Sequence, residues 1–196
     1  MKRAWLLTAF EPFAGRPENN SQLVLAEIKK IAEADSLVFY YHVLPTEYDH
    51  CFDVLMEKVS SLKKDGITLE GILSLGEGAE EFKLETRANN LDDVPNFPDN
   101  KGVVRVEQKI FPKLKDETIP LRFPFEAFSR IRSSNSPGFY ICNHLCARAG
   151  HAFADPSQPY FGFIHVPRAG QGGVFTPDVC AAMIVNSLKK YKDFCR

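Results

Sequence analysis

One cysteine of this chain stands where its thiol could act as a nucleophile. The stretch SNSPGFYICN, residues 134–143, is rich in turn-forming residues, then becomes apolar and brings Cys142 to the expected start of a helix. The first amides of a helix lack intrahelical partners and carry partial positive charge, which lowers the pKa of a thiol beside them. We therefore expect a reactive thiolate at Cys142. The alternative interpretation is a buried structural cysteine that packs as a small hydrophobic residue.

A histidine and a glutamate elsewhere in the chain are the partners that a thiol hydrolase needs. The apolar stretch FGFIHVP, residues 161–167, is typical of a strand and carries one imidazole, that of His165. The stretch KLETRANN, residues 83–90, contains Glu85. A nucleophile, a general base and a carboxylate that orients the base form a catalytic triad if the fold brings them together. On its own, each of these residues is weak support for catalysis.

Two further groupings could suggest a metal or a phosphate site. Zinc-ligand residue types occur at Cys142, His144, Cys146 and His151. The two cysteines fall on one helical face and His144 on another, and no second CxxC or HxxxH pair completes a site. The glycine-rich GQGG at 170–173 lacks the lysine and hydroxyl residue of a phosphate-binding loop. We therefore expect no metal and no other cofactor.

The bulk composition limits the classes of partner and the number of domains. A chain of 196 residues with 44% hydrophobic residues can bury one sizeable core, so we expect a single domain over residues 1–196. A net charge of −1 without a long basic run argues against nucleic acid or an anionic membrane as partner. No apolar stretch approaches the roughly 20 residues that cross a bilayer. Five cysteines without a framework pattern favour a reducing compartment, and we expect a cytoplasmic protein that begins directly with a strand.

The elements that must position these residues alternate between strand and helix, which predicts an α/β sandwich. The hydrophobic pattern predicts strands over 4–10, 37–44 and 71–75, and a further strand that leads to Cys142. Helical spacing predicts helices around 24–31 and 52–62, over 122–132, and from Thr176-Pro177 onward. The region 92–118, dense in proline, aspartate and lysine, is expected to be the least regular part.

Six short segments in a fixed order resemble a known family. They are TAFEPFAG at 8–15, Asn19 with Ser21, LPTEY at 44–48, ETRANN with FPDN at 97–100, SNSPGFYICN, and GFIHVP. Together they span nearly the whole chain and resemble the type I pyroglutamyl peptidases, also called pyrrolidone carboxyl peptidases. With the alternation of elements, the resemblance implies an α/β/α sandwich around a central mixed, mostly parallel twisted sheet.

The resemblance also implies an activity and the residues that carry it. It implies removal of an N-terminal pyroglutamyl residue from peptides by a cysteine mechanism without a metal. Carried over by position, Cys142 is the nucleophile, His165 the general base and acid, and Glu85 the group that orients the imidazole. The family further implies a homo-oligomer, often a tetramer.

A pyroglutamyl group has no charged amino terminus, so its pocket should be small and apolar with a few hydrogen bonds to the lactam. Phe10 and Phe13 suit the pocket because aromatic faces can sandwich a flat five-membered ring, although either could equally be a core residue. By resemblance, Asn19 lies near the lactam, and Tyr140 and Ile141 line the pocket beside the nucleophile.

Some positions depart from the family pattern. The residue after Glu85 is Thr86 where a basic residue is usual, and the loop before Glu85 is about two residues shorter. Pro137 stands before Gly138 and removes a backbone donor near the nucleophile, and Glu77 falls where some relatives carry glutamine. These departures leave two alternatives open. One is a weakly active or inactive relative that binds pyroglutamyl peptides, and the other is a thiol amidase for another small lactam or acylamide.

Overall fold

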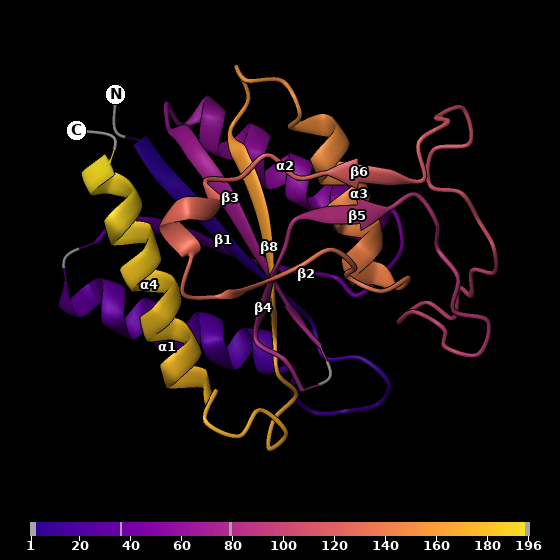
Figure 1. Cartoon of the computed structure of the whole chain (residues 1–196), viewed down its shortest axis with the longest axis horizontal. Coiled ribbons are helices and arrows are strands. Elements are labelled where there is room, and N and C mark those ends of the chain that lie inside the picture. Colours follow the sequence, from indigo (N-terminus) through magenta and orange to yellow (C-terminus); the bar gives the residue numbers. More distant parts are fainter. Residues whose placement is uncertain (1–2, 36, 79, 195–196) are drawn as a thin grey trace.

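A mixed sheet of six strands forms the centre of the computed structural model, which describes residues 3–35, 37–78 and 80–194. The strands lie in the order β2-β1-β3-β8-β4-β7 (Figure 1). Their bounds are β1 Arg3–Phe10, β2 Phe39–Leu44, β3 Thr68–Glu77, β4 Lys83–Glu85, β7 Arg132–Ser134 and β8 Tyr160–Val166. β2, β1, β3 and β8 are parallel, β4 pairs antiparallel with β8, and β7 pairs parallel with β4. The carboxyl ends of the four parallel strands therefore meet at one edge of the sheet.

Helices cover both faces of this sheet. α1 (Asn20–Ala34) and α4 (Pro177–Phe194) lie on one face, and α2 (His50–Lys64) and α3 (Ile141–Ala152) lie on the other (Figure 1). Because side chains alternate along a strand, Trp5 and Leu7 of β1 pack into different cores from Leu6 and Phe10. The predicted α/β/α sandwich with a mixed, mostly parallel sheet is confirmed. Within the described residues, no helix has both the length and the apolar character needed to span a membrane.

A smaller antiparallel pair lies beside α3. It consists of β5 (Arg87–Asn89) and β6 (Thr118–Pro120), and the chain between them has no regular element apart from an isolated bridge between Asp92 and Gln108. In Figure 1 these loops extend beyond β5 and β6 at one side of the molecule. The expected irregular region over 92–118 is therefore confirmed, with its last residue already in β6.

Two predicted elements are wrong. Instead of a helix over 122–132, the chain forms only a short 3₁₀ turn, η1 (Phe125–Phe128), and the Arg122 carbonyl accepts from the Phe161 amide at 3.0 Å instead of from a helical turn. The strand that was to lead to Cys142 ends at Ser134, well before the cysteine. Pro137 and Gly138, the latter with φ of 83°, break the extended path in between.

Candidate active site

The Cys142 side chain lies against the end of the central strand β3. It is the second residue of α3, after Ile141, and Tyr140 stands at the N-cap without a side-chain capping bond. A Cβ atom added to Gly76 would come 2.7 Å from Cys142 Sγ and 2.5 Å from a ring carbon of Phe163. The missing side chain at Gly76 thus lets the helix start approach the strand closely enough for the thiol to contact its backbone.

His165 reaches the same point from the neighbouring strand. It pairs in register with Gly76 across β3 and β8, and its ring carbon Cδ2 would lie 3.3 Å from a Cβ atom added to Gly78, two residues beyond the glycine that Cys142 Sγ contacts. The Phe163 ring lies beside the imidazole, with 5.0 Å between ring centroids. Phe163 and His165 are two residues apart on one strand and therefore share the sheet face on which α3 lies.

Glu85 completes the group from the antiparallel strand β4. Its Oε1 atom lies 2.8 Å from His165 Nδ1, and its side chain is fully buried. The structure thus brings together all three residues that the sequence proposed for a triad, from an α-helix and two strands. With Nδ1–H donated to Glu85, Nε2 is the imidazole nitrogen left to exchange a proton.

The surroundings of Glu85 keep it a carboxylate. Burial by itself would raise its pKa, but the hydrogen bond and charge of His165 outweigh burial, and Lys83 adds a cation whose Nζ lies 3.7 Å from Glu85 Oε1. The pKa of Glu85 is therefore lowered. A hydrogen bond from the Ser134 side chain lowers the Glu85 pKa further.

The expected low pKa of Cys142 is wrong for this structure. Burial, together with the nearby carboxylates of Glu85 and Glu77, raises the pKa of the thiol to about 12. Both effects disfavour the thiolate, and they outweigh the amides at the start of α3. The Cys142 side chain is therefore a thiol at neutral pH, and it would need a base to accept its proton if it is to act as a nucleophile.

A small cavity of about 30 Å³ opens beside the thiol. It is lined by Phe10, Phe13, Asn19, Thr46, Glu77, Tyr140, Ile141 and Cys142. All five residues that the sequence proposed for substrate binding thus lie together, next to the proposed nucleophile. Thr46 was missed, although it lies inside the quoted segment LPTEY; its hydroxyl donates to the Glu11 carbonyl at 2.8 Å.

Comparison with known proteins decides the family. The sequence model of the pyroglutamyl peptidase family matches residues 3–191. The chain belongs to the pyroglutamyl peptidase family. It is therefore a peptidase, hence a hydrolase, and the resemblance read from the six sequence segments is confirmed.

Curated and solved members of the pyroglutamyl peptidase family cover most of the chain. Pyrrolidone-carboxylate peptidase 1 of Caldanaerobacter subterraneus subsp. tengcongensis is 30% identical over 83% of this chain and 81% of its own. The Pyrococcus furiosus pyrrolidone-carboxylate peptidase is 28% identical over 94% and 93%. Pyroglutamyl peptidase I of Bacillus amyloliquefaciens shares the fold, with a TM-score of 0.77 at 21% identity and 95% of each chain covered.

The pyroglutamyl peptidase segment at Asn19 and Ser21 is built to hold the loop between β1 and α1. The Asn19 side chain caps α1 by accepting from the Ser21 amide at 3.0 Å, and its Nδ2 donates to the Glu11 carbonyl at 3.0 Å. Ser21 Oγ in turn accepts from the Phe10 amide at 3.1 Å. These bonds fix Asn19 at the pocket wall and leave its amide nitrogen one further hydrogen to donate.

The departure at Thr86 has a structural role. Its backbone N–H and its hydroxyl both donate to the Ser134 carbonyl, at 2.8 and 2.9 Å, which ties the end of β4 to β7. The cation nearest Glu85 comes instead from Lys83.

Pro137 is buried, and the carbonyl of the following Gly138 accepts from Asn89 Nδ2 at 2.9 Å, so this segment is held against β5.

One histidine of the alternative zinc grouping, His144, lies in a separate ion-pair cluster. His144 Nδ1 lies 2.7 Å from Asp92 Oδ2, and His144 Nε2 lies 3.2 Å from Asp49 Oδ1. Arg105 binds both aspartates. Within the part of the chain that the structure describes, no three or more His, Cys, Asp or Glu side chains gather as a metal site would require.

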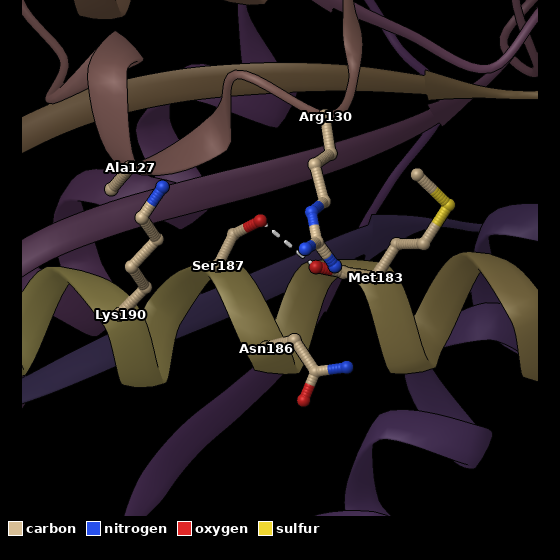
Figure 2. Close-up of a pocket in the computed structure, with 6 residues that line it drawn as sticks. All are labelled: Ala127, Arg130, Met183, Asn186, Ser187 and Lys190. Carbon is tan, nitrogen blue, oxygen red and sulfur yellow. Dashed lines mark hydrogen bonds between the residues drawn. The ribbon is translucent and has the colours of Figure 1, made fainter.

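A larger cavity of about 220 Å³ lies between η1 and α4, on the other face of the sheet. Figure 2 shows the residues that line it, Ala127, Arg130, Met183, Asn186, Ser187 and Lys190. The Ser187 hydroxyl donates to the Met183 carbonyl of its own helix at 2.9 Å. Neither a histidine nor a carboxylate lines this cavity, so it offers no base for a nucleophile.

Proposed function

We propose that the chain removes N-terminal pyroglutamate from peptides, with Cys142 as nucleophile, His165 as general base and acid, and Glu85 as the residue that orients the imidazole. The observation that carries this proposal is the 2.8 Å contact between His165 Nδ1 and Glu85 Oε1 beside Gly76, the residue that Cys142 Sγ also contacts. The curated relatives are named pyrrolidone-carboxylate peptidases, which supports the choice of substrate.

In the first half of the proposed reaction, His165 Nε2 takes the thiol proton as Cys142 Sγ attacks the carbonyl carbon of the pyroglutamyl residue. The negative charge that develops on the carbonyl oxygen would be stabilised by amide N–H groups at the start of α3. The C–N bond then breaks, and the imidazolium returns its proton to the leaving amine. Cys142 remains as a thioester of pyroglutamate.

In the second half, His165 takes a proton from a water molecule that attacks the thioester carbonyl. The C–S bond breaks, and the imidazolium reprotonates the sulfur. Free pyroglutamate leaves, and the site returns to its thiol form. This general-base route suits a thiol whose pKa is raised to about 12, because the thiolate need form only during attack.

Substrate entry requires the pocket to open. A cavity of about 30 Å³ has room for about one water molecule. Phe13 and Tyr140 are the half-buried aromatic residues of its wall, with 6.2 Å between their ring centroids. We expect these two rings to separate when the lactam ring enters between them, while the buried Phe10 and Ile141 stay in place.

The direct test is hydrolysis of pyroglutamyl-aminomethylcoumarin by the purified chain under reducing conditions. We expect Cys142→Ala and His165→Ala to abolish cleavage and the prolyl analogue not to be cleaved. Cys180→Ala removes a buried thiol in α4 and is the matched control, with thermal unfolding recorded for every variant. No cleavage by folded wild-type chain would reject the proposal, and binding of an uncleaved pyroglutamyl peptide would then favour an inactive relative.

A thiol amidase for another small lactam or acylamide is the second candidate, favoured by the charged Glu77 in the pocket wall. It would be identified by cleavage of a coumarin substrate that carries such a lactam or acyl group in preference to the pyroglutamyl substrate.

We also propose that the whole chain is one domain, that it acts in the cytoplasm, as the cysteine content indicates, and that it forms a homo-oligomer.

A further inference from the structure

A charged pair lies at the pocket wall, outside the proposed triad. Glu77 is the last residue of β3 and lines the pocket, and its side chain is only 1% exposed. Its Oε1 atom binds Nη1 of Arg16, a residue of the loop between β1 and α1. Burying a carboxylate beside a small apolar pocket costs free energy unless the charge is paired and hydrogen-bonded.

The position of Glu77 is fixed from several sides. Oε2 accepts from the Asn20 amide at 2.8 Å, at the start of α1, and Oε1 also lies 3.4 Å from Arg168 Nε. A carboxylate has about four acceptor positions. These three partners leave it one acceptor position, on Oε2.

Arg16 is folded back over another pocket residue. The Arg16 amide donates to the Phe13 carbonyl at 3.2 Å and closes a turn whose central residues, Ala14 and Gly15, have φ of 55° and 69°. Positive φ at alanine is unfavourable, so the turn holds a strained conformation. It places the guanidinium carbon 4.4 Å from the centre of the Phe13 ring.

The Arg16 guanidinium retains an unused donor. Among the described residues, Nη2 is buried and has no hydrogen-bond partner, whereas Nη1 of the same planar group contacts Glu77. Arg16 does not itself line the closed pocket, but its guanidinium contacts Phe13 and Glu77, which do, so Nη2 would come within reach of a ligand when the Phe13 ring moves aside. A buried donor without a partner costs free energy, which an acceptor from a ligand would recover.

We propose that Arg16 and Glu77 together bind the lactam amide of the substrate, with Arg16 Nη2–H donating to the ring carbonyl and Glu77 Oε2 accepting from the ring N–H. The five-membered ring forces this amide to be cis, so its N–H and C=O point the same way. An arginine beside a carboxylate presents the complementary donor and acceptor side by side. This assignment rests on the proposed function and names the residues that select for its substrate.

The pair also accounts for discrimination against proline. An N-terminal prolyl group has no ring carbonyl and carries a protonated amine. Arg16 would then keep its unpartnered donor and add repulsion between like charges. Glu77 cannot donate to a lactam carbonyl, and Arg16 supplies the donor that this carboxylate lacks.

The kinetic test uses Arg16→Met and the double variant Arg16→Met/Glu77→Gln. Methionine keeps an apolar stem over Phe13 but removes the donor, and the second change removes the unpaired charge that the first leaves behind. We expect both variants to lose about 10- to 100-fold in kcat/KM for the pyroglutamyl substrate, mainly through KM. Neither the variants nor the wild-type chain should cleave the prolyl analogue. Arg132→Met, which breaks an exposed pair with Glu81, is the matched control.

Binding of the lactam alone separates this inference from the proposed function. Calorimetric titration of the wild-type chain with 2-pyrrolidone should give a Kd at least about tenfold lower than that of Arg16→Met. Cyclopentanone, which lacks the N–H, should bind more weakly than 2-pyrrolidone to the wild-type chain. Equal 2-pyrrolidone affinities in wild type and Arg16→Met, or wild-type kinetics restored in the double variant, would overturn the assignment. Selective lactam binding without turnover would uphold it and reject the peptidase proposal.

Discussion

At the scale of single residues, the site combines an acid that is kept ionised with a thiol that is kept neutral. Glu85 is buried and Cys142 is half-buried, and desolvation by itself raises the pKa of each group. His165 reverses this effect for Glu85, because a hydrogen bond stabilises the carboxylate. For the thiol, the hydrogen bond from the Cys142 backbone amide is too weak to offset burial and the nearby carboxylates. In the proposed mechanism, attack by Cys142 therefore depends on proton transfer to His165.

The first prediction concerns Glu85, the carboxylate that we propose orients His165. Glu85→Gln keeps the shape of the side chain but removes the charge that stabilises the imidazolium, so kcat for the pyroglutamyl substrate should fall about 10²- to 10⁴-fold with little change in KM. Steady-state kinetics with purified variants measures both constants. Glu81→Gln, at a half-exposed glutamate of the adjoining loop, is the matched control and should retain wild-type rates. A loss of less than about threefold in Glu85→Gln would remove Glu85 from the proposed mechanism.

At the scale of elements, a buried charge cluster joins the start of α2, the middle of α3 and the irregular segment. His144 of α3 lies between Asp92 and Asp49, and Arg105 binds both aspartates and stacks on the Tyr48 ring at 4.5 Å. The Tyr48 ring also packs against His144 and against Tyr140, which lines the pocket. The cluster therefore supports one wall of the proposed active site.

This cluster makes stability depend on pH in a defined direction. Burial on its own lowers the pKa of His144, but hydrogen bonds to Asp49 and Asp92 outweigh it and raise the pKa above its usual value of 6.5. A raised pKa means that the histidine contributes its full stabilisation below about pH 6.5 and loses it as the pH rises through the folded-state pKa. The positive charge of Arg105 opposes this rise in the pKa of His144. Arg148 forms a further ion pair with Asp49.

We predict that His144→Gln lowers the free energy of unfolding by about 1–3 kcal/mol near pH 5.5 and by progressively less as the pH increases. Urea unfolding at pH 5.5, 7 and 8.5 would measure the difference from the wild-type chain. His151→Gln changes an exposed histidine of the same helix, is the matched control and should show only a small difference. A constant difference for His144→Gln would mean that His144 is not charged in the folded chain.

The sequence predicted long elements better than short ones. The helices over 20–34, 50–64 and 177–194 have regular apolar spacing, whereas β4, β5, β6 and β7 have three residues each and are set by pairing with distant strands. The predicted helix over 122–132 failed because its phenylalanines pack into the core around a proline, and their spacing imitates a helical face.

The candidate site was predictable where a short segment carries the chemistry, as at Cys142 and His165. Arg16 was not, since its role comes from a strained turn and from a carboxylate 61 residues away in the chain. The thiol pKa was mispredicted for a related reason. The helix start is visible in the sequence, but the burial and the two carboxylates that outweigh it come from other elements.

At the scale of the whole molecule, the irregular segment combines an exposed apolar surface with a link to the pocket. Four apolar side chains are 42–55% exposed: Val103, Val104, Val106 and Phe139. The Asp93 amide of the irregular segment donates a hydrogen bond to the Phe139 carbonyl at 3.2 Å. A group of exposed apolar side chains is typical of an association surface, whereas single ones are ordinary. The Pro98 carbonyl of the same segment accepts a hydrogen bond from the Tyr140 hydroxyl, at 2.9 Å. Association over this surface would therefore steady the wall of the pocket.

The last prediction is that the chain forms a homo-oligomer through this surface. Light scattering coupled to gel filtration should give a mass that is a multiple of 22.1 kDa. The double variant Val104→Asp/Val106→Asp should shift it to the monomer, because carboxylates buried in an apolar interface lose their hydration. Val174→Asp, at a valine 77% exposed in the loop before α4, is the matched control and should keep the wild-type mass. A monomeric wild-type chain would reject the oligomer, and an unchanged mass in the double variant would place the interface elsewhere. If both expectations hold, the monomeric variant should show a raised KM, since Tyr140 would lose the support that association gives to the segment holding its hydroxyl.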